Sequence, residues 1–138
     1  MVEGAAGEKM MGIDGDILRF FEKKPQALPL YEALEQAVSQ WVPGAGRKVR
    51  KTQITFSNRR VFACASLLRV KKAKELPQPY LVATFGLSRR VDSPRIAAAV
   101  EPYPGRWTHH VVIGAASEID GELLGWIEEA AAFSAGKR

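Results

Sequence analysis

A run of β-strand patterns in the middle of the chain is the feature that most limits its fold. Residues 51–56 alternate polar and apolar side chains, which is typical of a half-buried strand. Residues 61–68 are almost wholly apolar, as in a central strand, and residues 80–87 are rich in β-forming side chains. Residues 107–113 supply the last strand. Short turns between consecutive strands, as at residues 57–58, predict a mostly antiparallel sheet of four to five strands.

Helical patterns stand at both ends of this run. Asp14 is a suitable N-cap for a short first helix. A second amphipathic helix begins near residues 27–29 and ends before the Pro-Gly segment at 43–46. The final helix opens at residues 117–120, where Ser117 can cap it and the acids suit the helix dipole. We therefore predict an α+β fold in which two N-terminal helices and one C-terminal helix pack on the same face of the sheet.

The sequence predicts one domain over residues 14–138, preceded by a flexible tail over residues 1–13 that is rich in glycine and small residues. Two segments inside the domain are less regular. Residues 94–100 fit either a short helix or a strand, and residues 102–105 fit a turn or loop.

Composition and motifs restrict the class of protein. No apolar run approaches the ~20 residues of a membrane span, and the first twelve residues lack the basic and apolar regions of a signal peptide. The single cysteine, Cys64, forms no intramolecular disulfide, and we expect it to be a buried, inert thiol in an apolar strand. These features favour a cytoplasmic protein. The spacings typical of metal sites and phosphate-binding loops do not occur, so we predict neither metal nor cofactor.

Charge is distributed unevenly along the chain. Residues 47–95 hold thirteen Lys and Arg against two acidic residues, a net charge of +11. The rest of the chain holds seven basic and thirteen acidic residues, a net charge of −6. Because the basic segment coincides with the predicted sheet, we expect one positive and one negative side, and an anionic partner for the positive side.

Six short segments of the chain form a recognisable series. They are Leu-Tyr-Glu-Ala-Leu at 30–34, Lys-Thr-Gln-Ile-Thr-Phe at 51–56, Arg-Val-Phe-Ala at 60–63, Arg-Trp-Thr-His-His-Val at 106–111, Glu-Ile-Asp at 118–120 and Trp-Ile-Glu-Glu-Ala at 126–130. In order and spacing they resemble the DUF5655 family, small bacterial domains of unknown function. The resemblance covers roughly residues 17–133. It implies a compact α+β domain used as a module, and it brings no catalytic residues.

The only two histidines, His109 and His110, are adjacent. On a regular strand they point to opposite faces, so they cannot chelate one metal as a pair. A near-neutral pKa suits histidine to acid–base chemistry or to contact with phosphate. The plainer interpretation is one structural histidine and one surface histidine.

Paired basic residues are the second group of candidates. Lys51 is expected to project from its strand opposite the apolar side chains. The pair Arg59 and Arg60 follows at a turn, and Arg89 and Arg90 flank the end of the third strand. Arginine is well suited to bind phosphate or carboxylate through its planar fork. The candidate ligand-binding residues are Lys51, Arg59, Arg60, Arg89, Arg90, Arg106, His109 and His110, whereas lysines 71–74 are interpreted as a solvated loop.

Exposed aromatic rings near basic residues would suit single-stranded nucleic acid, because bases stack on them. Tyr103, in a proline-flanked loop beside Arg106, is the best candidate. Tyr80 and Trp107 are expected to belong to the core or an edge, while Trp41 and Trp126 fit the buried stripes of helices.

The sequence identifies no reaction, and three hypotheses follow. The leading one is a non-catalytic binding module for nucleic acid or an anionic small molecule on a basic sheet face. The second is a small hydrolase or transferase that uses His109 or His110 for acid–base chemistry beside arginines. The third is an interaction domain, such as a homodimer held by the acidic helices and the basic sheet.

Overall fold

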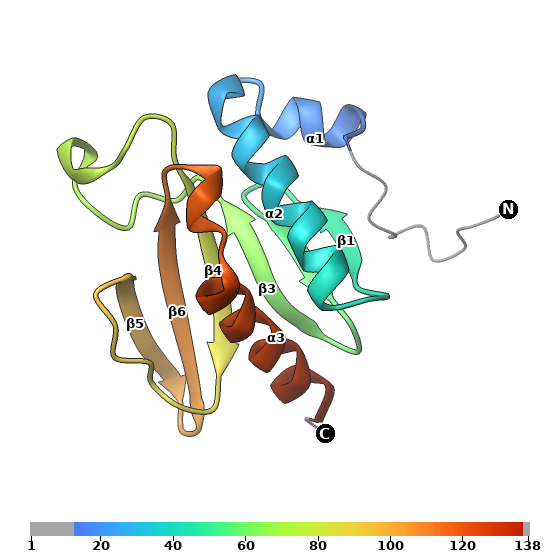
Figure 1. Ribbon diagram of the computed structural model, residues 1–138, viewed down its shortest axis with the longest axis vertical. Helices are drawn as coiled ribbons and strands as arrows, with labels where there is room; N and C mark the ends of the chain where they lie inside the picture. Colours follow the sequence, from blue (N-terminus) through green and yellow to red (C-terminus); the bar gives the residue numbers. More distant parts are fainter. Residues whose placement is uncertain (1–12, 137–138) are drawn as a thin grey trace, which may run out of the picture.

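The computed structural model describes residues 13–136 and contains, within them, three α-helices and six β-strands (Figure 1). The flexible tail predicted for residues 1–13 lies almost wholly outside the described residues. The elements are α1 (Gly15–Phe20), α2 (Leu28–Trp41), β1 (Gly46–Val49), β2 (Ile54–Ser57), β3 (Val61–Ser66), β4 (Leu81–Leu87), β5 (Ile96–Tyr103), β6 (Arg106–Ile113) and α3 (Gly121–Gly136), with 3-10 turns at Pro25–Ala27, Ala73–Glu75 and Ala116–Glu118.

All six strands form one antiparallel sheet in the order β1-β2-β3-β4-β6-β5. The predicted α+β class and antiparallel sheet are confirmed, but the strand number of four to five is too low. The unpredicted strand is β1, in which Lys48 pairs with Thr55. Its sequence, Gly-Arg-Lys-Val, resembles a loop, and only its hydrogen bonds to β2 make it a strand.

Several element boundaries differ from the prediction. Lys51 does not project from a strand: it lies in the turn closed by the Arg50 N–H, which donates to the Gln53 carbonyl over 2.8 Å. Of residues 94–100, predicted as a helix or a strand, residues 96–100 belong to β5, which continues through Pro102 and Tyr103, two residues predicted to lie in a turn or loop. The turn beyond it falls at Gly105, whose φ of 83° favours glycine.

The helix caps are partly as predicted. At α1 the Ile17 N–H donates to Asp14 Oδ1 over 3.1 Å, so Asp14 is the N-cap. At α3 the corresponding bond runs from the Leu123 N–H to Asp120 Oδ1, also over 3.1 Å. Ser117 lies in the preceding 3-10 turn and does not cap the helix, because α3 begins at Gly121, four residues beyond it.

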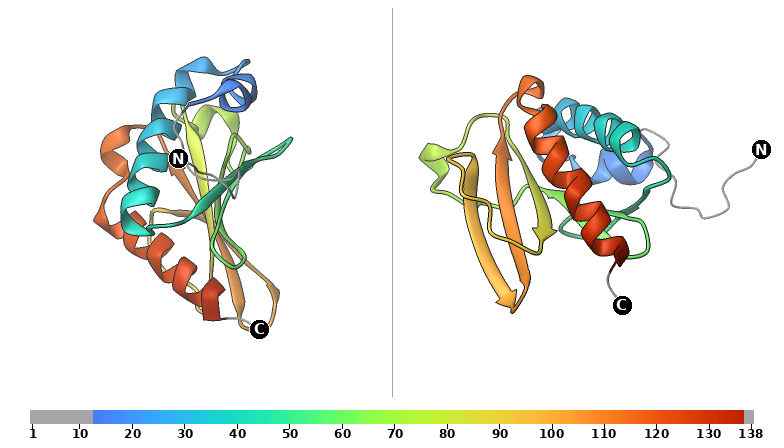
Figure 2. Two further views of the ribbon diagram at one scale, coloured as in Figure 1. Left: turned by 90° about the vertical axis from the view of Figure 1, so that its right-hand side faces the viewer. Right: turned by 60° about the horizontal axis from the view of Figure 1, so that its bottom comes forward.

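The helices α2 and α3 pack side by side on one face of the sheet, as Figure 2 shows. The main core lies between them and the sheet, and includes Phe56, Phe85 and Trp126. Trp41, predicted to be buried, is the last residue of α2 and is 37% exposed. We call this side of the sheet the helix face and the other side the helix-free face.

One end of the helix-free face is covered by the connection between β3 and β4. Leu76 and Tyr80 of this connection pack on Val82, with Val70 and Val112 at the margin of the cluster. The remaining part of the helix-free face carries polar side chains of β2, β3, β4 and β6.

Candidate functional site

The two histidines lie on opposite faces of β6, as the strand pattern predicts. His109 pairs with Phe85, and His110 pairs with Thr84 on the next strand. His109 is 0% exposed on the helix face, where its ring stacks on Phe85 at 5.3 Å. Its Nε2 accepts a hydrogen bond of 2.9 Å from the N–H of Val91, and burial lowers the pKa of its imidazole. His109 therefore holds the β4–β5 connection against the sheet.

The arginines of the β4–β5 connection bind α3. Arg89 donates two hydrogen bonds, of 2.9 and 2.8 Å, to the carboxylate of Glu129, and these bonds raise the pKa of Arg89 and lower that of Glu129. Arg95 donates to Asp120 over 2.7 Å and to Glu122 over 3.1 Å. Both arginines thus anchor α3 to the β4–β5 connection.

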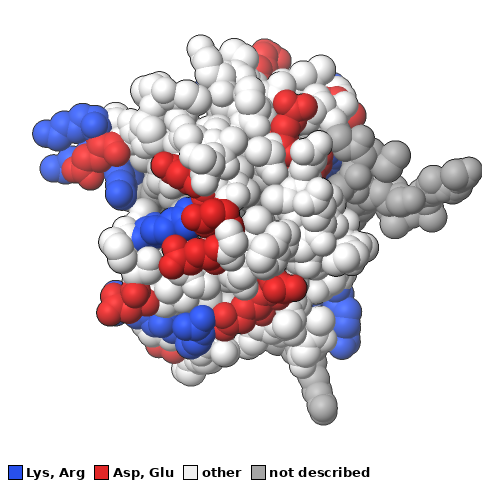
Figure 3. Space-filling model, in the orientation of Figure 1, with Lys and Arg blue, Asp and Glu red and all other residues white. Residues whose placement is uncertain are grey.

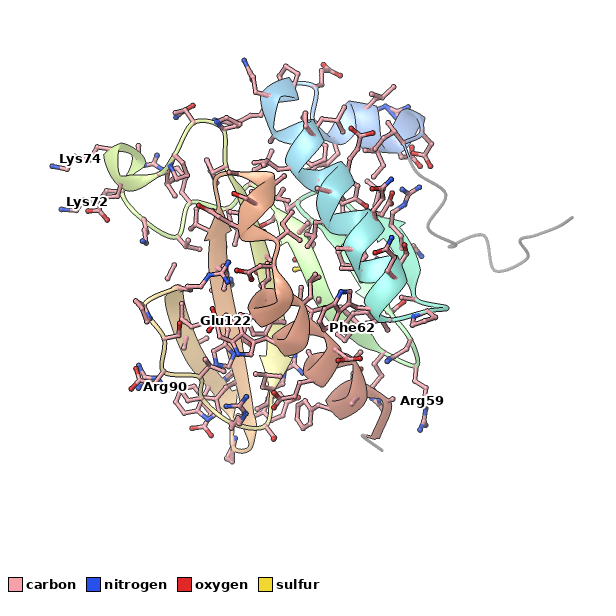
Figure 4. All side chains as sticks on the ribbon, in the orientation of Figure 1. Arg59, Phe62, Lys72, Lys74, Arg90 and Glu122 are labelled. Carbon is pink, nitrogen blue, oxygen red and sulfur yellow. The ribbon has the colours of Figure 1, made fainter. Side chains whose placement is uncertain are left out.

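The turn between β2 and β3 contacts the other end of α3. Arg59 donates to the Ala135 carbonyl over 3.2 Å, and Asn58 Nδ2 donates to the Ala131 carbonyl over 2.8 Å. Ala135 lies in the last turn of the helix, where carbonyls lack helical partners, and Ala131 lies one turn before it. Arg59 is labelled beside this end of the helix in Figure 4, and Arg60 is exposed in the same turn.

Two further basic side chains pack on the helix face. The guanidinium of Arg90 lies over the ring of Trp107, 5.7 Å from its centroid. Arg47 is buried and binds the carboxylates of Glu35 and Asp14. Of the thirteen Lys and Arg in residues 47–95, at least three, Arg47, Arg89 and Arg95, are thus paired with acids of the helices and their caps. In Figure 3 acidic side chains lie along α3, with basic side chains between them.

Arg106 is the basic residue that β6 places on the helix-free face. Its side chain crosses to β4 and lies over Gly86: a Cβ built on Gly86 would stand 2.5 Å from both Cζ and Nη2 of the guanidinium. Arg106 is half-buried, and it makes no hydrogen bond or ion pair within residues 13–136. The absence of a side chain at Gly86 is what allows a guanidinium to lie flat on the sheet here.

His110 stands near it on the same face. Its Nδ1 is 2.8 Å from the hydroxyl of Thr84, and burial lowers the pKa of its imidazole. Cys64 is the neighbour of Thr84 on β3. The thiol was predicted to be buried but is half-buried here; burial raises its pKa and keeps it protonated at neutral pH.

The β3–β4 connection adds a second group of positive charges. Its residues Arg69, Lys71, Lys72 and Lys74, here called the basic loop, are exposed. Lys72 and Lys74 point away from the body of the protein (Figure 4). A shallow groove of ≈760 Å³ lies between this loop and Ala97 of β5, lined by Arg69, Val70, Lys71, Lys72, Glu75 and Ala97.

The structure thus brings together two of the predicted ligand-binding residues, Arg106 and His110, and separates them from the others. The face site consists of Thr84, Gly86, Arg106, Thr108 and His110. Thr84, Gly86 and Thr108 were not predicted from the sequence as site residues. Alternation along β4 and β6 could have placed the threonines on the face of His110, but no local signal tells that an arginine would cover Gly86.

Within residues 13–136, none of the helices is long and apolar enough to cross a membrane, and no three His, Cys, Asp or Glu side chains are grouped to hold a metal ion. A family model described as "Domain of unknown function (DUF5655)" matches residues 18–134. No curated protein and no solved structure gives a significant match.

Proposed function

This chain belongs to the DUF5655 family, and we propose that it is a non-catalytic binding module for a phosphate-bearing partner, with single-stranded nucleic acid as the first candidate. The observation that carries the proposal is the position of Arg106. It is a half-buried guanidinium on the helix-free face with no acidic partner among the described residues. A half-buried arginine that lacks a counter-charge among the described residues is expected where a bound anion supplies that charge.

Further positive charge lies at the other end of the same strand. Arg106, Thr108, His110 and Val112 share one face of β6, and Val112 lies beneath the β3–β4 connection that carries the basic loop. From Arg106 to Val112 the strand rises about 20 Å. An extended polyanion laid along β6 would therefore meet Arg106 at one end and the basic loop at the other.

An aromatic ring accompanies the arginine. Tyr103 pairs with Arg106 across the β5–β6 hairpin and is 49% exposed. Stacking of a base on an exposed ring supports binding of single strands with little sequence preference. This combination favours a single strand over a duplex, whose bases are already stacked.

The test is fluorescence anisotropy with labelled single-stranded and double-stranded oligonucleotides. We expect binding of the single strand at ~50 mM salt that weakens steeply as salt rises, since each neutralised phosphate releases counterions. Absence of binding to any oligonucleotide at this salt concentration would contradict the nucleic-acid proposal.

Acid–base catalysis is supported less well. His109 is buried beneath the helices and bound to the backbone of Val91, so it is closed to a substrate. His110 alone remains, and its neighbour Thr84 is a poor proton acceptor. We therefore favour binding over catalysis.

A further inference from the structure

We infer that the face site, formed by Thr84, Gly86, Arg106, Thr108 and His110, is a subsite for a terminal phosphate group, such as the phosphorylated end of a single strand. The inference rests on the proposed function and specifies where on the binding surface the end of a bound nucleic acid lies. Four features support it: the placement of the guanidinium, the hydrogen bonding of His110, the spacing between these two groups, and the position of Arg106 at the end of β6.

The guanidinium of Arg106 is placed as a ligand-binding fork. Its Cζ, Nη1 and Nη2 atoms all lie 2.5–2.6 Å from the point where a Gly86 Cβ would stand. Such near-equal distances mean that the face of the group rests on the glycine. The N–H bonds, which lie in the plane of the group, then run along the surface of the sheet. A ligand lying on this surface is within their reach.

His110 supplies a second donor. When the Thr84 hydroxyl donates to Nδ1 over 2.8 Å, the neutral imidazole carries its proton on Nε2. Nε2 is at the outer end of the ring and makes no hydrogen bond with the described residues. Thr84 therefore fixes the ring and leaves Nε2–H as a donor toward the helix-free face.

The gap between the two donors suits a phosphate. Gly86 pairs with Thr108, so Gly86 and His110 are diagonal neighbours, about 7–8 Å apart. The guanidinium over Gly86 and the ring of His110 are therefore neighbours on one face, and a phosphate group placed between them can accept a charge-assisted hydrogen bond from each. The hydroxyl of Thr108, beside Gly86, faces the same gap.

The position of the face site at the end of β6 favours a terminal phosphate. Arg106 is the first residue of β6, directly after the hairpin turn at Gly105. The sheet ends at this turn, while the basic loop lies at the opposite end of β6. A single-stranded nucleic acid bound along β6 would therefore have one of its ends at Arg106. A terminal phosphate also offers one more free oxygen than an internal phosphodiester, which suits a site with three kinds of donor.

Gly86→Ala is the most specific variant. The added Cβ would displace the guanidinium, which is the flexible end of a side chain, so the fold should tolerate it. Gly125→Ala on α3 is the matched control, since nothing lies within 4 Å of its Cβ position. Arg106→Gln removes the charge itself and provides an independent second variant.

The experiment compares two oligonucleotides of one sequence, which carry a terminal phosphate or a terminal hydroxyl. We expect wild type and Gly125→Ala to bind the phosphorylated strand about tenfold more tightly, the effect of one charged hydrogen bond. In Gly86→Ala and Arg106→Gln the ratio should fall to near one. A wild-type ratio near one, or a ratio retained by both variants, would overturn the inference while leaving nucleic-acid binding intact.

If neither oligonucleotide binds, the nucleic-acid proposal fails and the subsite is decided separately. Inorganic phosphate is then titrated while the imidazole resonances of His110 are followed by NMR. A saturable shift that is absent in Arg106→Gln supports a subsite for a small phosphorylated molecule. The lack of any shift overturns the subsite.

Discussion

Arg89 and Arg106 both lie close to the neighbouring strands β4 and β6, but on opposite faces of the sheet. Arg89 lies on the helix face, where Glu129 of α3 binds it through two hydrogen bonds. Arg106 lies on the helix-free face over Gly86, without an acidic partner in residues 13–136. The difference shows that a count of basic residues does not measure a binding surface: what matters is whether the fold has already supplied the acid.

The comparison extends to other basic residues. Arg47, Arg89 and Arg95 each bind carboxylates that α2, α3 or the N-caps of α1 and α3 contribute. They stabilise the contact between helices and sheet. Arg106 and the basic loop do not contribute in this way, and we assign them to binding.

The buried pair of Arg47 and Glu35 should be the most important ion pair for stability. Burial opposes the charge on Arg47, but the hydrogen bond and charge of Glu35 outweigh it, and the pKa of Arg47 is raised. Glu35→Ala leaves this charge buried, and we expect a loss of about 3–5 kcal/mol in the free energy of unfolding. Urea denaturation measures it, with the exposed Glu32→Ala as control. Equal losses in both variants would contradict the assignment.

The buried His109 should make stability depend on pH. Its folded-state pKa lies below its ordinary value of 6.5, because burial disfavours the charged form. The unfolded state therefore takes up the proton first, and stability falls as pH drops from 7 toward 5. The carboxylates of Asp120 and Glu129, whose pKa values are lowered by Arg95 and Arg89, lose their contribution only at lower pH.

Denaturation at pH 7, 6 and 5 tests this expectation. Burial lowers the pKa of His110 as well, so both variants should reduce the pH dependence, but His109→Gln, at the fully buried position, should reduce it more than His110→Gln. A slope that follows His110 would show that the wrong histidine had been assigned the structural role.

Local patterns explain what could be predicted from the sequence. The Asp14 cap, the second helix and the opposite directions of His109 and His110 depend on residues within one turn or strand. The pairing of Arg89 with Glu129 spans 40 residues, and the contact of Arg106 with Gly86 joins two neighbouring strands, β6 and β4. Neither leaves a local signal. The edge strand β1 was missed for the same reason, because its hydrogen bonds to β2 define it.

The basic loop should control the salt dependence of binding. The double variant Lys71→Gln/Lys72→Gln removes two charges from the groove beside Ala97. If both contact phosphates of a single strand, the slope of log affinity against log salt should decrease by about 1.4. Anisotropy titrations at several salt concentrations measure the slope. An unchanged slope would remove the basic loop from the binding surface.

The exposed pair of Arg89 and Glu129 should contribute least. Surface ion pairs are worth about 0–1 kcal/mol, so Arg89→Gln should lower the free energy of unfolding by no more than that. High salt should reduce the difference further. A loss of several kcal/mol would mean that the β4–β5 connection depends on this pair far more than its exposure indicates.

The most direct test compares Arg106→Gln with Arg89→Gln in binding one labelled single-stranded oligonucleotide. Each variant removes one positive charge, so the change in net charge is the same. We expect Arg106→Gln to weaken binding about tenfold or more, as for a lost charged hydrogen bond, while Arg89→Gln binds like wild type. Equal weakening by both variants, or a greater loss from Arg89→Gln, would contradict the assignment of the helix-free face as the binding surface.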